Sequence, residues 1–456
     1  MNIGPAELGK MRSSFAGTIL TPTDTGYDAT RKVHNGLIDK RPAVIFVCND
    51  NADVVAAVNF AREEGYEVAI RGGGHNVAGR AVCDEGVMID LAQMKGVRVD
   101  PTSRYACAKP GVTWGEFNRE TQIHGLATTG GVVSSTGIAG LTLGGGIGYL
   151  MGKYGLTVDN LISAELVTAD GRSLTASEEQ NADLFWGLRG GGGNFGVVTN
   201  FEYRLHKVGP SVTGGFCAHL LDDAKEMLRF YRDFVLSMPD ELVVLGALVH
   251  APDGSGTKLA AMVAAHCEEH KIAEKDVAPL KQFGKPVLDN VGAMSYESLN
   301  TMFDAANPKG LLNYWKSGFF ARLSDDAIEI IVEQFAKAPS PLTSMYFEPF
   351  HGAAVRVDTQ ATAFPLRRSG LNFAIVSQWV DAARSDENIV WTRETFNALK
   401  PLLEHGSYVN YIDSDGNEQS VAGAYGPNFS RLREIKRRYD PNNLFHMNQN
   451  IPPADS

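Results

Sequence analysis

The glycine-rich stretch at residues 71–79, Arg-Gly-Gly-Gly-His-Asn-Val-Ala-Gly, constrains this chain more than any other feature. It directly follows a short apolar segment, residues 68–70, that is typical of a buried strand. Consecutive glycines remove side chains from a turn and allow positive φ angles that other residues avoid. The bare N–H groups of such a turn can bind an anion such as a pyrophosphate. The stretch alone has two interpretations: a bound cofactor beside a reactive imidazole, that of His75, or a glycine-rich surface loop with a solvated histidine. The rest of the chain decides between them.

The 48 glycines of the chain are clustered and not evenly spread. Besides residues 72–74, they gather at residues 130–148 and 190–196. Glycine at the end of a strand commonly marks a close approach of the backbone to a ligand. Residues 191–196 match the spacing Gly-x-Gly-x-x-Gly, but a predicted helix precedes them and a predicted strand follows, the reverse of a dinucleotide-binding turn. We therefore discount a nucleotide site of that type.

Composition narrows the class of protein. A chain of 456 residues is long enough for two or three structural units. The net charge of -11 argues against nucleic acid or an anionic membrane as a partner, since either requires a basic surface. The 5 cysteines are scattered without a Cys-x-x-Cys pair, which argues against a disulfide framework and a structural zinc site. No apolar run approaches the ~18 residues of a spanning helix. We expect a reduced, cytoplasmic protein without a metal.

The first half of the chain alternates between predicted strands and helices. We expect residues 1–37 to form an N-terminal segment that lies across the surface. Asn51 is the expected cap of a helix that ends at Gly65. The predicted helices are 51–64, 114–123 and 183–188, and the predicted strands are 43–47, 68–70, 87–91, 105–108, 161–168 and 197–205.

The character of the chain changes near residue 209, where glycines become less frequent and longer alternating strands begin. This half predicts a sheet covered by helices, with strands at 242–249, 259–265, 317–322, 344–350 and 373–379 and a helix at 325–337. A last helix is predicted at 429–439. We therefore expect three units after the N-terminal segment, with the boundaries 38–208, 209–405 and 406–456.

Motifs at both ends of the chain carry a family resemblance. The order of the motifs in the first half resembles the PCMH-type FAD-binding domain of the vanillyl-alcohol-oxidase superfamily: residues 71–76, 90–91, 130–148, 153–156, 159–160 and 192–199. The C-terminal motifs resemble those of berberine-bridge-enzyme-like oxidases: Tyr408-x-Asn410-Tyr411, Tyr425-Gly426, Arg431-Leu432, Lys436, Tyr439-Asp440-Pro441 and Gln449. The bacterial 6-hydroxy-D-nicotine-oxidase-like branch is the most similar in style.

The resemblance implies an α+β fold. FAD would lie between two α+β subdomains at residues 38–208, and an α+β substrate domain with a helix-covered sheet would follow. The resemblance also implies a covalent bond from His75 to the flavin 8α-methyl group. The implied cofactor-binding residues are His75, Arg71, Gly72, Gly73, Gly74, Asn76, Gly79, Thr136, Gly137, Gly140, Gly144, Gly145, Gly146, Gly148, Tyr154, Gly155, Asp159, Asn194, Val197, Val198 and Asn410.

The segment 131–137, Gly-Val-Val-Ser-Ser-Thr-Gly, departs from the family pattern at one position. Many relatives form a second flavin link from a cysteine in this segment, and the matching position here is Val133. We therefore expect FAD to be attached through His75 alone. In the family, the residue at the position of Thr136 is commonly valine or a bulkier side chain, and smaller residues there accompany good reaction of the reduced flavin with O₂. Thr136 has nearly the volume of valine, so the resemblance favours an oxidase.

Catalysis requires a hydride acceptor, which FAD supplies, and a base for the substrate O–H or N–H. The resemblance implies that the segment Tyr408-x-Asn410-Tyr411 lies near the flavin ring, so Tyr408 is the leading candidate for the base and Tyr411 the second. A tyrosine with a pKa near ~10 is a weak base unless a cation lowers that pKa, and Lys316 is the candidate cation. The candidates to line the substrate pocket are Glu348, His351 and Gln378, and Asn410 would orient a tyrosine or the flavin.

These observations predict an FAD-dependent oxidase that takes a hydride from a small alcohol, sugar or cyclic amine and passes the electrons to O₂, giving H₂O₂. One alternative keeps the fold and changes the acceptor: an FAD-dependent dehydrogenase or an oxidative-cyclisation enzyme of a biosynthetic pathway. Another is a flavin-binding protein without turnover, against which the intact Tyr408 and His75 argue. The sequence leaves the substrate and the oligomeric state open.

Overall fold

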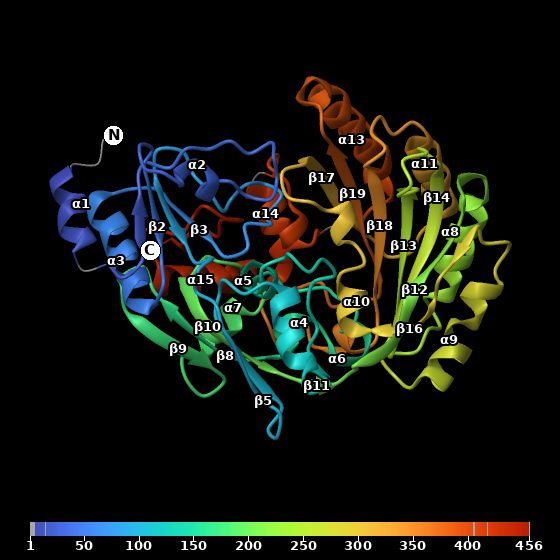
Figure 1. The fold of residues 1–456 in the computed structure, drawn as a ribbon, viewed down its shortest axis with the longest axis horizontal. Helices are drawn as coiled ribbons and strands as arrows, with labels where there is room; N and C mark the ends of the chain where they lie inside the picture. Colours follow the sequence, from blue (N-terminus) through green and yellow to red (C-terminus); the bar gives the residue numbers. More distant parts are fainter. Residues whose placement is uncertain (1–4, 14, 405, 417, 456) are drawn as a thin grey trace.

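The computed structural model describes residues 5–13, 15–404, 406–416 and 418–455. Residues 1–4 and 14 of the predicted N-terminal segment and the predicted boundary at residue 405 lie outside the described residues. Sheets and helices of both halves form one mixed assembly, which confirms the α+β class (Figure 1). Within the described part of the chain, no helix has the length and apolar character needed to cross a membrane.

The first half opens with a small sheet of strand order β1-β2-β4-β3, in which β2, β4 and β3 are parallel and β1 is antiparallel. Helix α3 (Asn51–Glu64) buries Val54, Ala57 and Val58. Its cap is Asp50, not the predicted Asn51, because the carboxylate of Asp50 accepts the N–H of Asp53. The strands are β1 (Thr18–Leu20), β2 (Val44–Val47), β3 (Val68–Arg71) and β4 (Val87–Asp90).

A second sheet, antiparallel throughout, has the strand order β5-β6-β10-β8-β9. Helix α4 (Trp114–Gln122) begins at a capping box formed by Thr113 and Glu116. The strands are β5 (Val97–Asp100), β6 (Tyr105–Ala108), β8 (Leu161–Val167), β9 (Ser173–Ser177) and β10 (Val197–Arg204). Between them lie β7 (Leu126–Ala127), α5 (Ile138–Leu143), α6 (Met151–Tyr154) and α7 (Ala182–Leu188), and β11 (His206–Lys207) pairs with β7.

The second half is organised around an eight-stranded antiparallel sheet of order β15-β12-β14-β13-β18-β19-β17, with β16 also paired to β12. Its strands are β12 (Ser211–Leu220), β13 (Leu242–His250), β14 (Lys258–His266), β15 (Leu288–Asp289), β16 (Gly292–Ser295), β17 (Leu312–Phe320), β18 (Ser344–Phe350) and β19 (Gly370–Trp379). Strand β17 begins before the predicted 317–322, because Leu312 already pairs with Trp379 of β19. Lys316 therefore lies in the middle of this strand.

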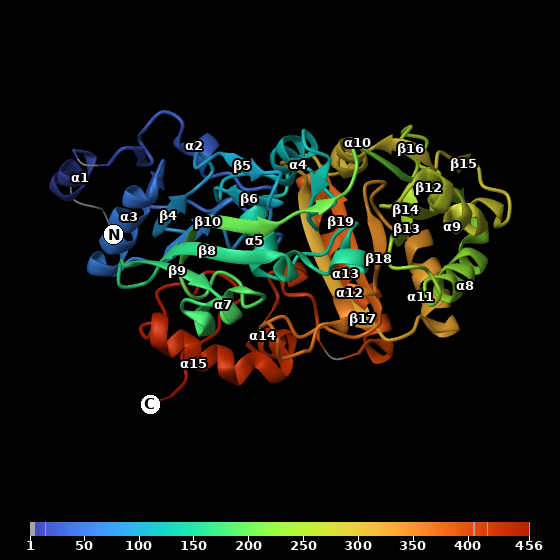
Figure 2. The ribbon, with the colours of Figure 1, turned by 90° about the horizontal axis from the view of Figure 1, so that it is seen from below.

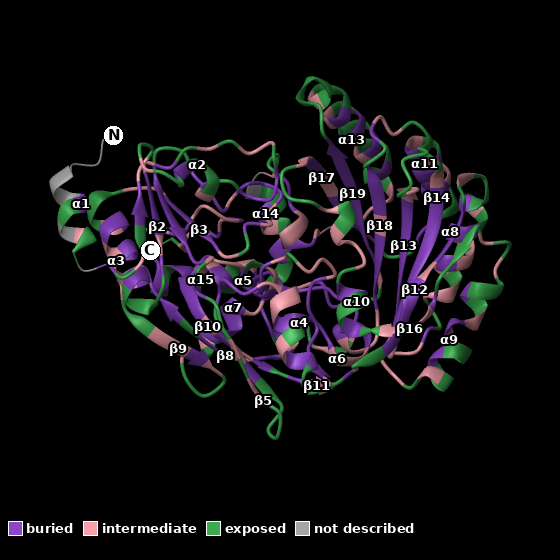
Figure 3. Cartoon of the chain, viewed as in Figure 1, coloured by how far each residue is buried: buried purple, intermediate pink, exposed green. Residues whose placement is uncertain are grey.

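The two faces of this sheet have different partners. Helices α8 (Ala224–Phe234), α9 (His270–Gln282), α11 (Asp325–Ala336) and α13 (Ser385–Leu399) cover the outer face (Figures 1 and 2). The other face packs through Leu245 and Phe319 against Tyr149 and Leu150 of the glycine-rich half. Most strand residues are consequently buried (Figure 3). Functional groups can gather where the sheet meets the glycine loops.

The last residues return to the first half of the chain. Helix α15 (Phe429–Tyr439) packs against α7, and the buried ammonium of Lys436 donates to the carbonyl of Asn194 at 2.8 Å. Helix α14 (Glu418–Tyr425) precedes it, after the 3₁₀ turn η6 (Val409–Tyr411). The C-terminal segment thereby places η6 beside the glycine loops.

The N-terminal segment does not lie across the surface as predicted. Strand β1 extends the first sheet, and Arg31, Val33, His34 and Asn35 are buried. The segment buries apolar side chains such as Phe15, Ile19 and Tyr27 as well as polar ones such as Asn35, and their irregular spacing gave no periodic signal.

Candidate functional site

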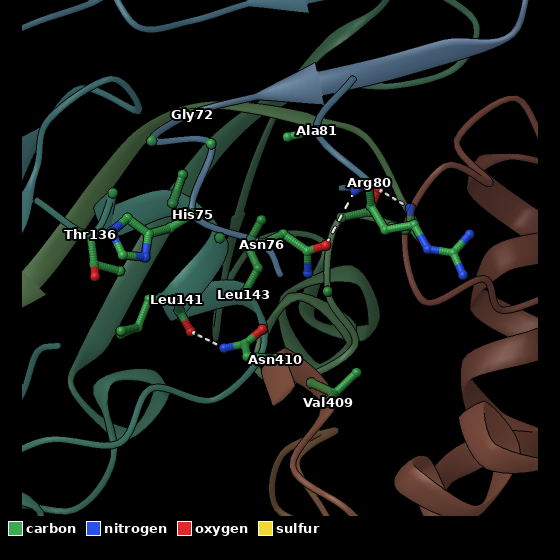
Figure 4. Close-up of a pocket in the computed structure, with 18 of the residues that line it drawn as sticks. Gly72, His75, Asn76, Arg80, Ala81, Thr136, Leu141, Leu143, Val409 and Asn410 are labelled. Atoms are coloured by element: carbon green, nitrogen blue, oxygen red, sulfur yellow. Dashed lines mark hydrogen bonds between the residues drawn. The ribbon is translucent and has the colours of Figure 1, made fainter. Parts of the chain in front are cut away.

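A cavity of about 290 Å³ lies between the glycine loops, η6 and the large sheet. It brings together predicted residues from positions far apart in the sequence. These are Gly72, Gly73, Gly74, His75, Asn76, Thr136, Gly137, Gly140, Val197, Val198, Glu348, Tyr408, Asn410 and Tyr411. Figure 4 shows His75 beside Thr136, with Asn410 reaching the same cavity from the C-terminal segment.

Backbone forms much of the cavity wall. The loop after β3 crosses the segment before α5 so closely that a Cβ atom on Gly73 would lie 2.5 Å from the backbone nitrogen of Gly137. In contrast, a Cβ atom on Gly140 or Gly193 would meet no atom within 4 Å among the described residues. Both of these glycines line the cavity, so their missing side chains leave room for a ligand. This cradle fits the cofactor that the sequence predicts.

His75 is half-buried in the cavity wall. Its Nε2 lies 3.1 Å from the hydroxyl oxygen of Ser135, and its ring stacks on that of His34 with a centroid distance of 3.8 Å. Burial lowers the pKa of His75 to about 3, and the neighbouring His34 adds to this effect. The imidazole is therefore neutral at physiological pH, the form in which a ring nitrogen is a nucleophile.

Tyr408 is fully enclosed by the site. Its Oη accepts hydrogen bonds from the N–H of Gly146 at 3.0 Å and from the amide of Asn410 at 2.8 Å. Asn410 also donates to the carbonyl of Leu141 (Figure 4). Burial raises the pKa of Tyr408 to about 12 although both hydrogen bonds act in the opposite direction. Tyr408 is thus a neutral phenol, held in place by Asn410.

Glu348 of β18 is the buried carboxyl group of the site. Its Oε1 accepts the hydroxyl of Tyr411 at 3.0 Å, and its Oε2 accepts the amide of Asn372 at 2.6 Å. Burial raises the pKa of Glu348 to about 7, and the two hydrogen bonds reduce that rise. A carboxyl group with this pKa can accept a proton near neutral pH.

A second cavity of about 70 Å³ adjoins the first and reaches into the large sheet. Glu348 and Tyr411 line both cavities, and so do Trp315 and Asn307. Apolar side chains form most of the remaining wall: Val132, Val133, Leu245, Phe303, Ala374 and Val376. The carboxyl group of Glu348 therefore lies where the cofactor cavity meets a small apolar chamber.

Several predicted cofactor residues have structural contacts and do not line the cavity. Arg71 binds the carboxylate of Asp90 through two hydrogen bonds. The ring of Tyr154 stacks on His206, with centroids 3.9 Å apart. The remaining predicted residues outside the lining are Gly79, Gly144, Gly145, Gly146, Gly148, Gly155, Asp159 and Asn194.

The sequence motif did not separate these supporting residues from those that face the ligand. The carboxylate of Asp159 pairs with the guanidinium of Arg367 at 2.7 Å. Asn194 donates to the carbonyls of Gly191 and Gln449. Such contacts hold the loops in place, so these positions act on the cavity through the backbone.

The catalytic expectations for Lys316 and Gln378 require correction. The ammonium of Lys316 pairs with Asp413 at 2.8 Å and with Asp415 at 3.2 Å, so it supplies no cation to Tyr408. Gln378 donates to Asn313 at 2.9 Å and lines neither cavity. His351 is likewise absent from both linings, since its Nε2 lies 3.1 Å from the carbonyl oxygen of Leu242.

Sequence reasoning also missed residues that line the cavity. Asn448 and Gln449 each present a buried side-chain oxygen without a hydrogen-bond partner among the described residues. Arg80, Leu141 and Trp315 also line the cavity and were not predicted. The single signal in the sequence was the place of Gln449 in the C-terminal motif. Buried acceptors without a partner are explained if a bound ligand donates to them.

Comparison with known proteins supports this interpretation of the site. Residues 42–177 match the family described as FAD binding domain, and residues 407–452 match the family described as berberine and berberine like. The chain is 30% identical to (R)-6-hydroxynicotine oxidase of Paenarthrobacter nicotinovorans, over 97% of this chain and 98% of that protein. It is 28% identical to tetrahydroberberine oxidase of Berberis wilsoniae, over 91% of this chain and 86% of that protein.

A solved structure shows the same arrangement. The crystal structure of 6-hydroxy-D-nicotine oxidase from Arthrobacter nicotinovorans superimposes with a TM-score of 0.88 at 30% identity, covering 97% of this chain and 99% of that chain. Sequence and fold therefore agree over nearly the whole length. The chain belongs to the berberine-bridge-enzyme-like FAD-linked oxidoreductases of the vanillyl-alcohol-oxidase superfamily, and it is an enzyme that uses FAD.

Proposed function

We propose that this enzyme is an oxidase that removes a hydride from a small alcohol, sugar or cyclic amine and returns the electrons to O₂, giving H₂O₂. The observation that carries the proposal is the buried Glu348, with a pKa near 7, at the junction of the two cavities. FAD supplies the hydride acceptor when bound. Glu348 takes the proton of the substrate O–H or N–H, and Tyr411 orients the carboxylate. This assignment replaces Tyr408 as the base.

The cofactor contacts follow from the cavity wall. We propose that residues 38–208 and the C-terminal segment hold FAD through the glycine loops, with Asn448 and Gln449 as additional acceptors. His75 provides a single covalent attachment, since its neutral imidazole lines the cavity and Val133 occupies the position of the second link. Residues 209–405 supply most of the substrate chamber, and Val132, Val133 and Tyr411 complete its wall.

The chamber favours one class among the predicted substrates. Among the described residues that line it, Glu348 is the single charged group, and most others are apolar or aromatic. A sugar would leave several hydroxyl groups without partners there, at a cost for each. A small cyclic amine, or an alcohol with an apolar body, fits better. The relative (R)-6-hydroxynicotine oxidase is consistent with a substrate of modest size.

Three measurements on the purified protein test the proposal. Acid precipitation should leave the yellow colour in the pellet, and flavin in the supernatant would contradict the bond to His75. Air should reoxidise the substrate-reduced enzyme with release of H₂O₂, whereas reoxidation over many minutes would indicate a dehydrogenase. A panel of cyclic amines, alcohols and sugars should include a compound that bleaches the flavin, and absence of bleaching with every class would indicate a binding protein.

The role of Glu348 has its own test. Glu348→Gln should slow flavin bleaching by roughly 10²- to 10⁴-fold, the range for loss of a general base. The flavin spectrum should not change. Glu202→Gln is the matched control, because Glu202 lies on β10, accepts a hydrogen bond from Ser163 and lines neither cavity. Equal rates in the two variants would place the base elsewhere.

A further inference from the structure

Residues 30–36, here called the strap, lie between the loop that carries His75 and the start of β17. On the loop side, Arg71 donates to the carbonyls of Thr30 and Lys32, and the N–H of His34 donates to the carbonyl of Gly74 at 2.9 Å. The strap is therefore hydrogen-bonded to the His75 loop at two points, Arg71 and Gly74.

The opposite edge of the strap binds the second half of the chain. The N–H of Gly310 donates to the carbonyl of His34 at 2.9 Å, and the N–H of Gly36 donates to the carbonyl of Leu311 at 2.8 Å. The approach is close, since a Cβ atom on Gly36 would lie 2.2 Å from the carbonyl oxygen of Gly310. The strap therefore lies between the His75 loop on one side and residues 310–311 on the other.

Asn35 joins all three segments through its side chain. Its amide donates to the carbonyl of Val77 at 2.8 Å and to the carbonyl of Asn313 at 2.9 Å, and its oxygen accepts the N–H of Asn313 at 2.9 Å. The side chain thus pairs with the backbone of Asn313 as a neighbouring strand would. Because Asn35 is 3% exposed, water cannot replace these bonds.

The contacts continue from Asn313 into the substrate chamber. The side-chain oxygen of Asn313 accepts from the indole of Trp315 at 3.3 Å and from the amide of Gln378 at 2.9 Å. Trp315 lines both cavities. A continuous set of hydrogen bonds therefore connects the His75 loop with a wall of the chamber.

The strap also contacts His75 directly. The ring of His34 stacks on the His75 ring at a centroid distance of 3.8 Å and an interplanar angle of 23°. His34 is itself buried, and its backbone is held on both sides. The stack therefore limits rotation of the His75 imidazole about its side-chain bonds.

We propose that the strap is the positioning element of the site: His34 orients the His75 imidazole toward the cofactor, and Asn35 sets the distance between the cofactor loop and the substrate chamber. The His34 part rests on the proposed covalent bond. That bond would join a ring nitrogen of His75 to the flavin 8α carbon in place of one N–H and one C–H bond; the flavin would keep two electrons and one of the two protons, the other proton would be released, and O₂ would reoxidise the flavin to give H₂O₂. The Asn35 part requires only that FAD binds.

The His34 part is tested by following acid-stable flavin after FAD is added to the apoprotein. His34→Ala removes the stack and should slow the appearance of acid-stable flavin by about 2- to 10-fold, the range for a lost aromatic pair. His34→Phe keeps a stacked ring and should restore most of the rate. His219→Phe is the control, because His219 is a buried histidine of β12 packed on Phe283.

Two outcomes distinguish the underlying proposals. If the wild-type protein forms no acid-stable flavin, the covalent bond to His75 is wrong. If the wild-type protein forms it and His34→Ala does so at the same rate, the orienting role of His34 is wrong.

The Asn35 part is tested by comparing substrate turnover with flavin content. Asn35→Leu should retain FAD but reduce kcat/KM per bound flavin by roughly 10-fold or more, since small misplacements of reacting groups are costly. The fluorescence of Trp315 should change as well. Asn35→Gln, a milder variant, should give an intermediate loss if Asn35→Leu does not fold.

Asn388→Leu provides the matched control for Asn35. Asn388 is equally buried, but its amide donates to the carbonyl of Arg384 at the start of the outer helix α13. If Asn35→Gln and Asn388→Leu lower the melting temperature equally and both leave kcat/KM per flavin unchanged, the strap has only a structural role and the proposal is wrong.

Discussion

The two walls of the cavity are built in different ways. The wall from the first half of the chain is largely backbone, with glycines at the loops after β3 and before α5. The wall from the second half consists of side chains such as Glu348 and Trp315 on the strands of an antiparallel sheet. Where backbone crosses backbone, as at Gly73, the wall has no room for a Cβ atom, whereas a side-chain wall can change its chemistry by single substitutions. The first wall suits a constant cofactor and the second a variable substrate.

The largest expected effect comes from adding one carbon atom to the backbone wall. Gly73→Ala would bring a Cβ atom to 2.5 Å from the nitrogen of Gly137, so one of the two crossing loops must move. Overpacking of this kind costs about 1–3 kcal/mol, so we expect FAD affinity to fall by roughly 10-fold or more. The ratio of flavin to protein absorbance measures the loss. Gly292→Ala, where a Cβ atom meets nothing within 4 Å, is the control, and normal flavin content in Gly73→Ala would contradict the prediction.

The second prediction concerns the side-chain wall and its dependence on pH. The pKa of Glu348 is raised from 4.5 to about 7 by burial. The carboxyl group therefore contributes stability below about pH 4.5 that is lost as the pH rises through about 7. The difference between these two pKa values corresponds to roughly 3 kcal/mol. The stability of Glu348→Gln relative to the wild type should therefore increase as the pH rises from about 5 to about 8.

Thermal unfolding at the two pH values measures this gain. The neutral amide can keep the hydrogen bond from Tyr411, and Asn372 can rotate to offer its side-chain oxygen, which has no partner among the described residues. Glu202→Gln is the control for the substitution itself, since Glu202 lines neither cavity. A constant difference for Glu348→Gln would mean that the carboxyl group ionises normally.

The contrast between the walls also explains what could be predicted from the sequence. The backbone wall was predictable, because glycine is required wherever backbone approaches backbone or ligand, and so the cavity contains Gly72–Gly74, Gly137 and Gly140 as expected. The same rule cannot separate Gly144, Gly145, Gly146 and Gly148, which do not line the cavity, from the glycines that do. Glycine there can make room for other protein groups, since a Cβ atom on Gly144 would meet the side chain of Asn410.

The side-chain wall was predictable only in part. Alternation predicts that Glu348 lies on a strand but not which face or neighbour it has, since these depend on register. Lys316 illustrates the failure: its partners Asp413 and Asp415 lie about a hundred residues away and carry no motif. The N-terminal strap was missed for the same reason, because its polar contacts with residues 71–77 and 310–313 are long-range.

The third prediction modifies the side-chain wall without removing its charge. Tyr411→Phe deletes the hydroxyl that donates to Glu348 at 3.0 Å, a bond that favours the ionised carboxylate. The rise of the bleaching rate with pH should move to higher pH by about one pH unit, equivalent to a hydrogen bond of ~1.5 kcal/mol to a charged group. Tyr439→Phe is the control, because it deletes a similar bond, 2.9 Å long, to Asp183. An unchanged pH profile in Tyr411→Phe would separate Tyr411 from the base.

The smallest effect on turnover is expected just outside the side-chain wall, at Lys316. Its ammonium pairs with Asp413 and Asp415 and contributes to neither cavity lining, so Lys316→Met should change the bleaching rate by less than about 3-fold. The variant leaves a nearly buried carboxylate at Asp413 without its cation, which should cost about 3 kcal/mol of stability, the lower end of the range for a broken buried pair. Lys225→Met, which breaks a more exposed pair with Glu329, should cost less. A large loss of turnover in Lys316→Met at unchanged flavin content would show that Lys316 takes part in catalysis, although it lines neither cavity.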